Sequence, residues 1–443
     1  MMPGADILRA GLVAALAVLT AFALRATLSL PRRRVWVLLL APYLMPSLLI
    51  GYAYSSFSLS LIHHPAANAM AYVLLLVLRL APVAALALYF APSPLTAEAR
   101  HCRRLACMSP AFGFWSDWRF RWQAGCARAP LTAFAVVFLL AFSEFELASL
   151  LNIRTWTVRL FDGHAGGLPL AESLALAAGP FLVEVIVLGL ALALFARQQW
   201  KQPDTPARTP ACFRSGWILL VAANLAVVLV PAAIVLHGTL QGWRVLAENF
   251  ALGSEILTSL LFGVLAAGAA YALAPRRWWL AVTVSVPGLL GPLVLALLIG
   301  VAVQSSPWFG LRDTPLPLLA ALSLLLLPLA VLLRQLLRRT APAASVHAAR
   351  LLGGAPGRRL VWLLSTRRHV WVIFLLFCLA YLDLTAAAIL APIGTAPVSV
   401  RLYNLMHYGR TAVLSAMVLA AVAAPLAALA VVLATRRVWM RVG

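Results

Sequence analysis

The chain has 443 residues, of which 63% are hydrophobic and 11% are charged. This composition excludes an ordinary soluble domain and indicates an integral membrane protein. The formal net charge of +22 could also fit a nucleic-acid-binding protein. The arginines, however, lie between apolar stretches and not in basic runs with aromatic residues, so no nucleic-acid partner is predicted. The five cysteines show neither a disulfide framework nor the spacing of a zinc site.

Apolar stretches of about 20 residues, the length that crosses a bilayer, recur along the whole chain. They predict an all-α integral membrane protein with about eleven transmembrane helices. The predicted spans are residues 7–30, 35–61, 68–91, 129–152, 168–197, 216–237, 253–274, 278–304, 315–337, 370–391 and 410–435.

Most of the 35 lysines and arginines fall in one set of connecting segments. These segments include the two long loops at 92–128 and 338–369, the linker at 201–215 and the C-terminal tail. Because loops rich in Lys and Arg stay in the cytoplasm, the N-terminus is predicted to lie outside and the C-terminus inside the cell.

The chain also repeats short sequences in a constant order, which predicts an internal duplication. The recurring elements are Pro31-Arg32-Arg33 and Pro275-Arg276-Arg277, Leu48-Leu49-Ile50-Gly51 and Leu297-Leu298-Ile299-Gly300, Pro82 and Pro328, His101 and His347, Pro110 and Pro356, Glu144-Phe145 and Asp383-Leu384, and Val158-Arg159-Leu160-Phe161-Asp162 and Val400-Arg401-Leu402-Tyr403-Asn404.

We interpret this pattern as two parallel five-helix permease repeats. Two tandem units with an odd number of spans face opposite ways unless another span lies between them, and 216–237 is that linking helix. The predicted organisation is a first module at 1–200, a linker at 201–215, and a second module with six spans at 216–443. A parallel duplication differs from the inverted repeats of many secondary transporters.

These features together resemble the fused permease subunits of bacterial binding-protein-dependent ABC importers, of the iron(III) and thiamine type and the type-I membrane fold. In that family a cytoplasmic loop reads Glu-Ala-Ala, three further residues and Gly, and it docks into the ATPase. The second long loop here reads His347-Ala348-Ala349-Arg350-Leu351-Leu352-Gly353. The first reads His101-Cys102-Arg103-Arg104-Leu105-Ala106-Cys107, without the glutamate or the glycine. The family also has a leading span in each half that the first half here lacks.

The resemblance implies a non-enzymatic permease subunit in a bacterial inner membrane that forms the pathway for a small solute. Its expected partners are a cytoplasmic ABC ATPase dimer, a periplasmic or extracellular solute-binding protein and the lipid bilayer. No cofactor is expected, and the chain has no phosphate-binding glycine loop of its own. Iron(III), thiamine and other small solutes stay open as substrates. A secondary transporter and a non-transporting membrane scaffold with degenerate loops are the alternatives.

The candidate ATPase-coupling residues lie in the two long loops, where basic side chains surround a short helical segment. A glycine pair ends the segment in the second loop, as expected of a helix C-terminus. The coupling residues are His101, Arg103, Arg104 and Cys107 in the first loop, and His347, Ala348, Ala349, Arg350, Gly353 and Gly354 in the second.

Charged residues inside predicted spans are costly and usually face a cavity or a partner. Glu144 and Asp383 occupy equivalent positions in the two repeats and are candidates for the translocation path or its gate. A structural ion pair or an interfacial carboxylate is the alternative. Arg79 lies in the middle of a span, and Glu184 matches it best in depth. We therefore expect an intramembrane Arg79–Glu184 pair.

Arg159 and Arg401 lie in the repeated Val-Arg-Leu-aromatic element and are predicted on the outer surface. There they could receive a binding protein or steer an anionic ligand, or they could anchor the chain at the interface. The histidines on this side show no ligand spacing, so no metal site is predicted.

Overall fold

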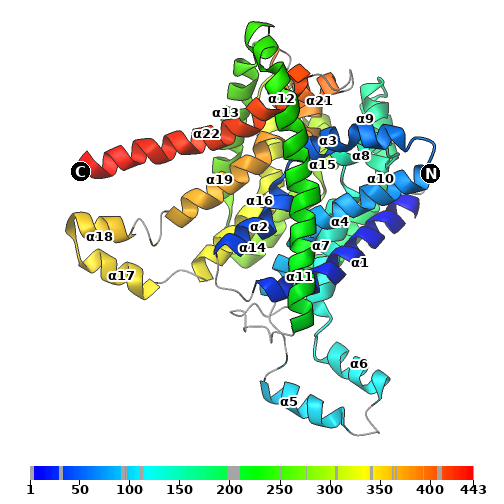
Figure 1. The fold of residues 1–443 in the computed structure, drawn as a ribbon, viewed down its shortest axis with the longest axis vertical. Coiled ribbons are helices and arrows are strands. Elements are labelled where there is room, and N and C mark those ends of the chain that lie inside the picture. The colour runs from blue at the N-terminus through cyan, green and yellow to red at the C-terminus, as the bar shows by residue number, and fades with distance from the viewer. Residues whose placement is uncertain are drawn as a thin grey trace. The chain divides into compact units, whose positions relative to one another are not determined.

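The computed structural model describes residues 4–28, 33–90, 95, 97–108, 113–196, 210–249, 252–275, 277–304, 308–339, 343–361, 364, 367–392, 394–406 and 412–442. All regular secondary structure in these ranges is helical (Figure 1). The prediction of an all-α protein is therefore confirmed for the described part of the chain.

Seven of the described helices are long and apolar enough to cross a membrane, and two bent helix pairs raise the number to as many as nine. The protein is therefore a multi-pass membrane protein, and eleven spans stays a prediction. The seven are Gly4–Thr27, Pro65–Tyr89, Glu172–Leu194, Arg214–Arg244, Gly253–Leu273, Leu316–Gln335 and Ala412–Val431. The shorter apolar helices are Pro292–Gln304 and Arg368–Tyr381.

Proline and glycine interrupt two of the predicted spans. The stretch predicted as one span at 35–61 forms α2 (Arg33–Leu44) and α3 (Ser47–Ser60), bent by 69° next to Pro46. The stretch at 278–304 forms α14 (Trp278–Ser285), a 3₁₀ turn from Pro287, and α15 (Pro292–Gln304), with Gly291 at φ +81°. Proline lacks the N–H that continues a helix, and glycine tolerates a positive φ, so the breaks follow from these residues.

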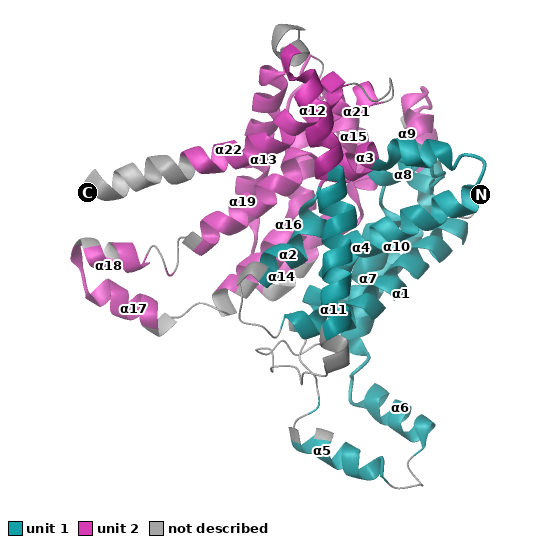
Figure 2. Ribbon diagram, in the orientation of Figure 1, with its two compact units in different colours: residues 1–45, 54–160, 175–231 teal, residues 46–53, 161–174, 232–443 magenta. Residues whose placement is uncertain are grey.

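The chain forms two compact units, each built from more than one stretch of sequence (Figure 2). Unit 1 comprises residues 1–45, 54–160 and 175–231, and unit 2 comprises residues 46–53, 161–174 and 232–443. The boundaries predicted from the sequence, by contrast, divide the chain into consecutive stretches.

Three long helices form the centre of unit 1, because α1, α4 and α7 all pack against one another. Small residues on the packed face of α1, including Ala14, Ala17 and Ala21, are completely buried and allow close approach. The elements assigned wholly or mainly to unit 1, besides α2, are α1 (Gly4–Thr27), α4 (Pro65–Phe90), α5 (Ala97–Ala106), α6 (Phe114–Gln123), α7 (Arg128–Phe142), α8 (Glu146–Leu150), α10 (Leu170–Ala196) and α11 (Pro210–Ala223). The residues of α9 (Trp156–Ala165) are divided between the two units after Leu160.

Unit 2 has a similar centre, in which α13, α16 and α19 pack against one another. Gly263 on α13 lies close to α19, where an added Cβ would stand 3.0 Å from the Phe377 ring. Besides α14 and α15, the elements of unit 2 are α12 (Val230–Asn249), α13 (Gly253–Leu273), α16 (Leu316–Arg339), α17 (Ala343–Leu351), α18 (Gly354–Val361), α19 (Arg367–Tyr381), α20 (Thr385–Leu390), α21 (Val398–Met406) and α22 (Ala412–Val442).

The predicted linking helix at 216–237 is longer than expected. α11, a π-helical segment (Asn224–Leu229) and α12 together run from Pro210 to Asn249. The Asn224 amide donates to the carbonyls of Leu38 and Leu220, which gives the π segment a partner outside its own helix. Most of the predicted linker at 201–215 lies outside the described residues.

Candidate functional site

Glu144 lies where unit 1 interrupts its third central helix. The stretch predicted as one span at 129–152 forms α7 and α8, and residues 143–145 separate them. Glu144 Oε1 accepts a hydrogen bond from the backbone N–H of Leu147 at 2.8 Å, which caps the start of α8. The Glu144 carbonyl accepts a hydrogen bond from Thr157 Oγ1 at 2.8 Å, which ties the break to α9.

Asp383 lies at the corresponding break in unit 2. The stretch predicted as one span at 370–391 forms α19 and α20, with residues 382–384 between them. Asp383 Oδ1 accepts from the backbone N–H of Ala386 at 2.9 Å, and the Asp383 carbonyl accepts from Ser399 Oγ on α21 at 2.9 Å. Both acidic residues therefore cap the next short helix, and both receive a hydroxyl from the helix that follows it.

The two breaks differ in charge. Glu144 Oε2 lies 3.3 Å from Arg79 Nη1 on α4, and the two side chains are 11% and 15% exposed. In the repeat, Leu325 stands in the place of Arg79. Among the residues that the structure describes, Asp383 makes no ion pair. The break in unit 1 is therefore charge-compensated, whereas the described residues offer the Asp383 carboxyl at the break in unit 2 only backbone donors.

The expected Arg79–Glu184 pair is wrong, because Arg79 pairs with Glu144. Depth in the membrane was the basis for choosing Glu184, but packing decides the partner: α4 packs against α7, which ends just before Glu144. Glu184 on α10 is 1% exposed, and neither carboxylate oxygen has a hydrogen-bond partner within the described part of the chain.

Two further acidic residues, each at the start of the first central helix of a unit, were not predicted from the sequence. Asp6 on α1 lies 3.2 Å from Arg159 on α9, and Glu255 on α13 lies 3.8 Å from Arg401 on α21. Arg159 and Arg401 remain about half exposed at 51% and 46%. Their acidic partners lie far away in the sequence and outside the repeated motif, so the motif alone carried no signal for them.

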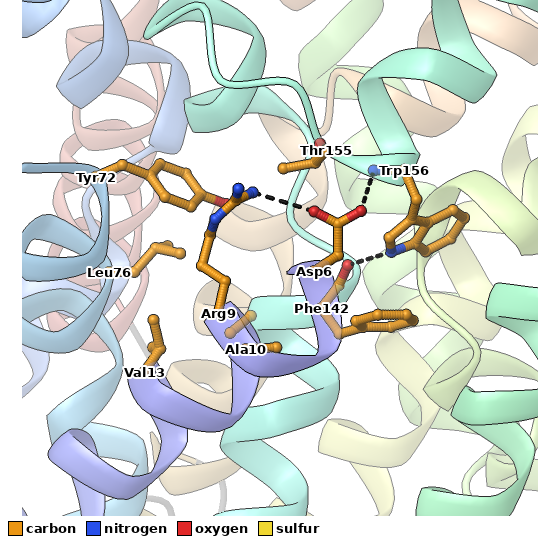
Figure 3. A pocket seen from close by; sticks show the side chains of 10 residues that line it. Asp6, Arg9, Ala10, Val13, Tyr72, Leu76, Phe142, Thr155 and Trp156 are labelled. Carbon is orange, nitrogen blue, oxygen red and sulfur yellow. Dashed lines mark hydrogen bonds and ion pairs between the residues drawn. The ribbon is translucent and has the colours of Figure 1, made fainter. Parts of the chain in front are cut away.

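A small polar pocket surrounds Asp6 between α1, α4, α7 and α9 (Figure 3). Asp6 accepts from Arg9 at 3.1 Å and from the backbone N–H of Trp156 at 3.0 Å. The indole N–H of Trp156 donates to the carbonyl of Phe142 at 2.7 Å, which satisfies one of the free carbonyls at the C-terminus of α7. The buried Tyr72 ring lies 6.0 Å from the Arg9 guanidinium carbon. Asp6 thus joins α1 to α9 at one end of unit 1.

Unit 2 contains a simpler version of this contact. The backbone N–H of Val398, at the start of α21, donates to Ser259 Oγ at 2.8 Å. A serine hydroxyl therefore takes the place that an aspartate occupies in unit 1, and Glu255 supplies the charge separately.

The predicted coupling residues lie on two pairs of short helices between spans. α5 and α6 connect α4 to α7, and α17 and α18 connect α16 to α19 (Figure 1). All these candidates are exposed except Ala349, which is 2% exposed, and Arg103, which is half-buried. The exposed candidates are His101, Arg104, Cys107, His347, Ala348, Arg350, Gly353 and Gly354.

An aspartate holds the first helix pair together. Arg103 on α5 donates two hydrogen bonds to Asp117 on α6, one of them at 3.0 Å, and Arg121 also pairs with Asp117. These hydrogen bonds, the one from Arg103 first, lower the pKa of Asp117 to about 2. The pair formed by Arg103 was not predicted, because its partner lies in the following helix.

Backbone packing holds the second helix pair together. Gly353 and Gly354 between α17 and α18 have φ angles of +59° and +56°, which favour glycine. A Cβ added to Gly357 would lie 2.7 Å from the carbonyl oxygen of Ala349. The two helices can therefore approach closely only because residue 357 has no side chain.

The helices and their breaks define the protein as an all-α, multi-pass membrane protein with polar residues at interrupted spans. Comparisons with protein-family models, with curated proteins and with solved structures find no match to this chain.

Proposed function

We propose that this chain is the membrane-spanning permease subunit of an ABC importer, with both repeats in one chain and the ATPase on a separate partner. The observation that carries the proposal is a pair of short helices between the second and third central helices of each unit. α5–α6 lies between α4 and α7, and α17–α18 lies between α16 and α19. A transporter driven by an ATPase dimer needs two such contact elements, one for each ATPase subunit.

The succession of elements supports the two-repeat interpretation. The same order of elements occurs from α1 to α10 and from α13 to α22. Each succession begins with a central helix, an interrupted helix pair and a second central helix, followed by two short helices and a third central helix. A break with an acidic residue, two shorter helices and a long helix complete it. α11 and α12 stand between the two successions. With this linking helix, both repeats face the same way and both short-helix pairs lie on the cytoplasmic side.

In this proposal the acidic breaks lie along the pathway. Closure of the ATPase dimer moves the short-helix pairs, and the third central helices carry the movement to Glu144 and Asp383. At each break the carboxylate caps the next helix, so no backbone hydrogen bonds run across the break. The angle between the two helices can therefore change without breaking hydrogen bonds within either helix. The solute, of the iron(III) or thiamine kind in the resembled family, arrives from a solute-binding protein on the outside.

Co-purification from native membranes tests the proposal. We expect an ABC ATPase to accompany the wild-type chain, and to be lost from the Gly353→Asp variant, which puts a charged side chain at a left-handed, exposed position between α17 and α18. Gly310→Asp is the matched control, because Gly310 is exposed and an added Cβ there meets nothing within 4 Å. Absence of an ATPase from all three well-folded samples would refute the importer, and its retention by Gly353→Asp would refute coupling through α17–α18.

One observation favours a secondary transporter as the second candidate. Glu184 is buried in a membrane-spanning helix without a hydrogen-bond partner within the described residues, and such carboxyls are found in proton pathways. A secondary transporter of this kind would take up protons into proteoliposomes without ATP or an ATPase, and Glu184→Gln would abolish the uptake. Unchanged uptake in that variant, or none in the wild type, would remove this candidate.

A further inference from the structure

Helix α6 exposes a ridge of aromatic side chains that no element of the described chain covers. Trp115, Trp118 and Trp122 are 75%, 50% and 54% exposed, and Phe114 is 76% exposed. The spacing of the tryptophans places them on one face of the helix. Trp118 stacks on Trp122 with ring centroids 5.5 Å apart, and Trp115 meets Trp118 edge to face at 6.3 Å. The three indole rings therefore form one continuous aromatic surface.

The charged residues of α6 lie beside this ridge or behind it. Asp117 faces α5, where it bonds to Arg103, so its negative charge is compensated. Arg119 is exposed at the edge of the aromatic face, and Arg121, which is also exposed, pairs with Asp117. An aromatic face bordered by arginines is typical of a helix that lies in the interface of an anionic membrane.

The short connection to α7 fixes how far α6 lies from the start of α7 and the direction in which it runs. Only residues 124–127 separate the two helices, and a turn closed by the bonds Gly125 N–H to Trp122 O and Cys126 N–H to Arg121 O joins them. Four residues span at most about 14 Å. The axes of α6 and α7 differ by 74°. A helix so close to the start of a membrane-spanning helix, and nearly perpendicular to it, lies along the membrane surface.

α6 and α7 form one of the two bent pairs that could each count as a single span, but the charges of α6 argue against its lying in the hydrocarbon core. Its ten residues include Asp117, Arg119 and Arg121, and each charge placed in the hydrocarbon core costs roughly 2.5–3.5 kcal/mol. The tryptophans have the opposite preference, because the apolar indole ring with its N–H group is most stable among lipid headgroups. The two preferences are satisfied together only at the interface.

We propose that α6 is an interfacial helix whose tryptophan ridge inserts among the headgroups and upper acyl chains of an anionic lipid surface, with Arg119 contacting lipid phosphates. An ATPase is the competing occupant of the ridge. α18, the second helix of the other pair, has the sequence Gly-Ala-Pro-Gly-Arg-Arg-Leu-Val, and a single tryptophan, Trp362, follows it in the sequence where α6 has three. Two helix pairs that meet equivalent ATPase subunits have no reason to differ in this way, whereas an anchor specific to one loop explains the difference.

Spin labels on opposite faces of α6 test the assignment. In a chain whose five cysteines are changed to serine, Trp118→Cys places a label on the ridge, and Ser116→Cys places the matched control label on the other exposed side of the same helix. Each labelled chain is reconstituted without ATPase in nanodiscs that contain phosphatidylglycerol. We expect the ratio of oxygen to nickel-chelate collision rates to be several-fold higher at position 118 than at position 116. Trp115→Cys, on the ridge as well, should behave like Trp118→Cys.

Equal access of the nickel chelate to both positions would overturn the proposal. Shielding of position 118 from both reagents only after the ATPase is added would assign the ridge to a protein partner instead. A ratio that stays the same in purely zwitterionic nanodiscs would refute the role of anionic lipid. Because the ratio of collision rates is first measured without ATPase, failure of the co-purification experiment would leave that ratio unchanged.

Discussion

The ion pair between Arg79 and Glu144 leads to the most discriminating prediction. Its atoms are 3.3 Å apart, and the two side chains are 15% and 11% exposed. Two unit charges at about 4 Å attract with about 4 kcal/mol at an effective dielectric constant of about 20. Removing one partner of a buried pair commonly costs about 3–5 kcal/mol, because the other charge remains unpaired.

The perturbation is Arg79→Leu, which installs the residue found at the corresponding position 325. We expect it to lower the free energy of unfolding by about 3 kcal/mol. Glu144→Gln should cost less, because the amide oxygen can still accept from the backbone N–H of Leu147. The double variant should recover about 2 kcal/mol of the summed losses, because neither charge is then left alone. Reversible unfolding in mixed detergent micelles, followed by circular dichroism, measures these differences.

Glu184→Gln supplies the matched control, because Glu184 is a buried glutamate in another membrane-spanning helix and has no hydrogen-bond partner among the described residues. In the double variant with Arg79→Leu, its effect should add to that of Arg79→Leu within about 0.5 kcal/mol. Additive effects for Arg79 and Glu144, together with coupling between Arg79 and Glu184, would refute the pairing and restore the one expected from depth alone.

Three further predictions concern the ends of the units, the first helix pair and helix packing. Asp6→Asn should destabilise the protein by about 2 kcal/mol, because Asp6 is 6% exposed and has three partners. Glu255→Gln should cost less than about 1 kcal/mol, because Glu255 is more exposed and lies 3.8 Å from its partner Arg401. The pKa of Asp117 is lowered from 3.8 to about 2, so its pairing with Arg103 should stay intact above about pH 4 and weaken as the pH falls toward 2. The distance between spin labels on α5 and α6 measures this change. Gly288→Ala should destabilise unit 2, because its Cβ would lie 2.0 Å from a backbone oxygen of α16. Gly268→Ala on α13 is the control: its Cβ would meet nothing within 4 Å, so this variant should be neutral or stabilising by up to about 1 kcal/mol. Thermal unfolding measures both effects.

Each of these predictions has an outcome that contradicts it. Equal losses for Asp6→Asn and Glu255→Gln would mean that the extra partners of Asp6 contribute nothing. A distance between α5 and α6 that already changes near pH 6, or that changes alike in Asp117→Asn, would remove Asp117 from the contact. Equal melting temperatures for Gly288→Ala and Gly268→Ala would show that the close approach to α16 does not constrain the packing.

The membrane class and the helical architecture were predictable from the sequence, because a bilayer imposes a length and an apolar composition on each span. The end of the first short helix in the second long loop was also readable. Gly353 and Gly354 mark the end of a helix through the φ angles that only glycine adopts without strain. The repeat brought Glu144 and Asp383 to attention as an equivalent pair before any contact was known.

The partners of the charged residues were decided only by the tertiary structure. Depth along a span is a one-dimensional coordinate, and it cannot tell which helices are neighbours or which side of a helix faces them. Arg79 therefore pairs with Glu144 across the α4–α7 contact, and Arg159 pairs with Asp6, which lies 153 residues away in the sequence. The breaks at residues 143–145 and 382–384 contain neither proline nor glycine, so local sequence carried no signal for them. They form because a carboxylate caps the next helix while a hydroxyl from a later helix satisfies the freed carbonyl, and that arrangement exists only in the folded chain.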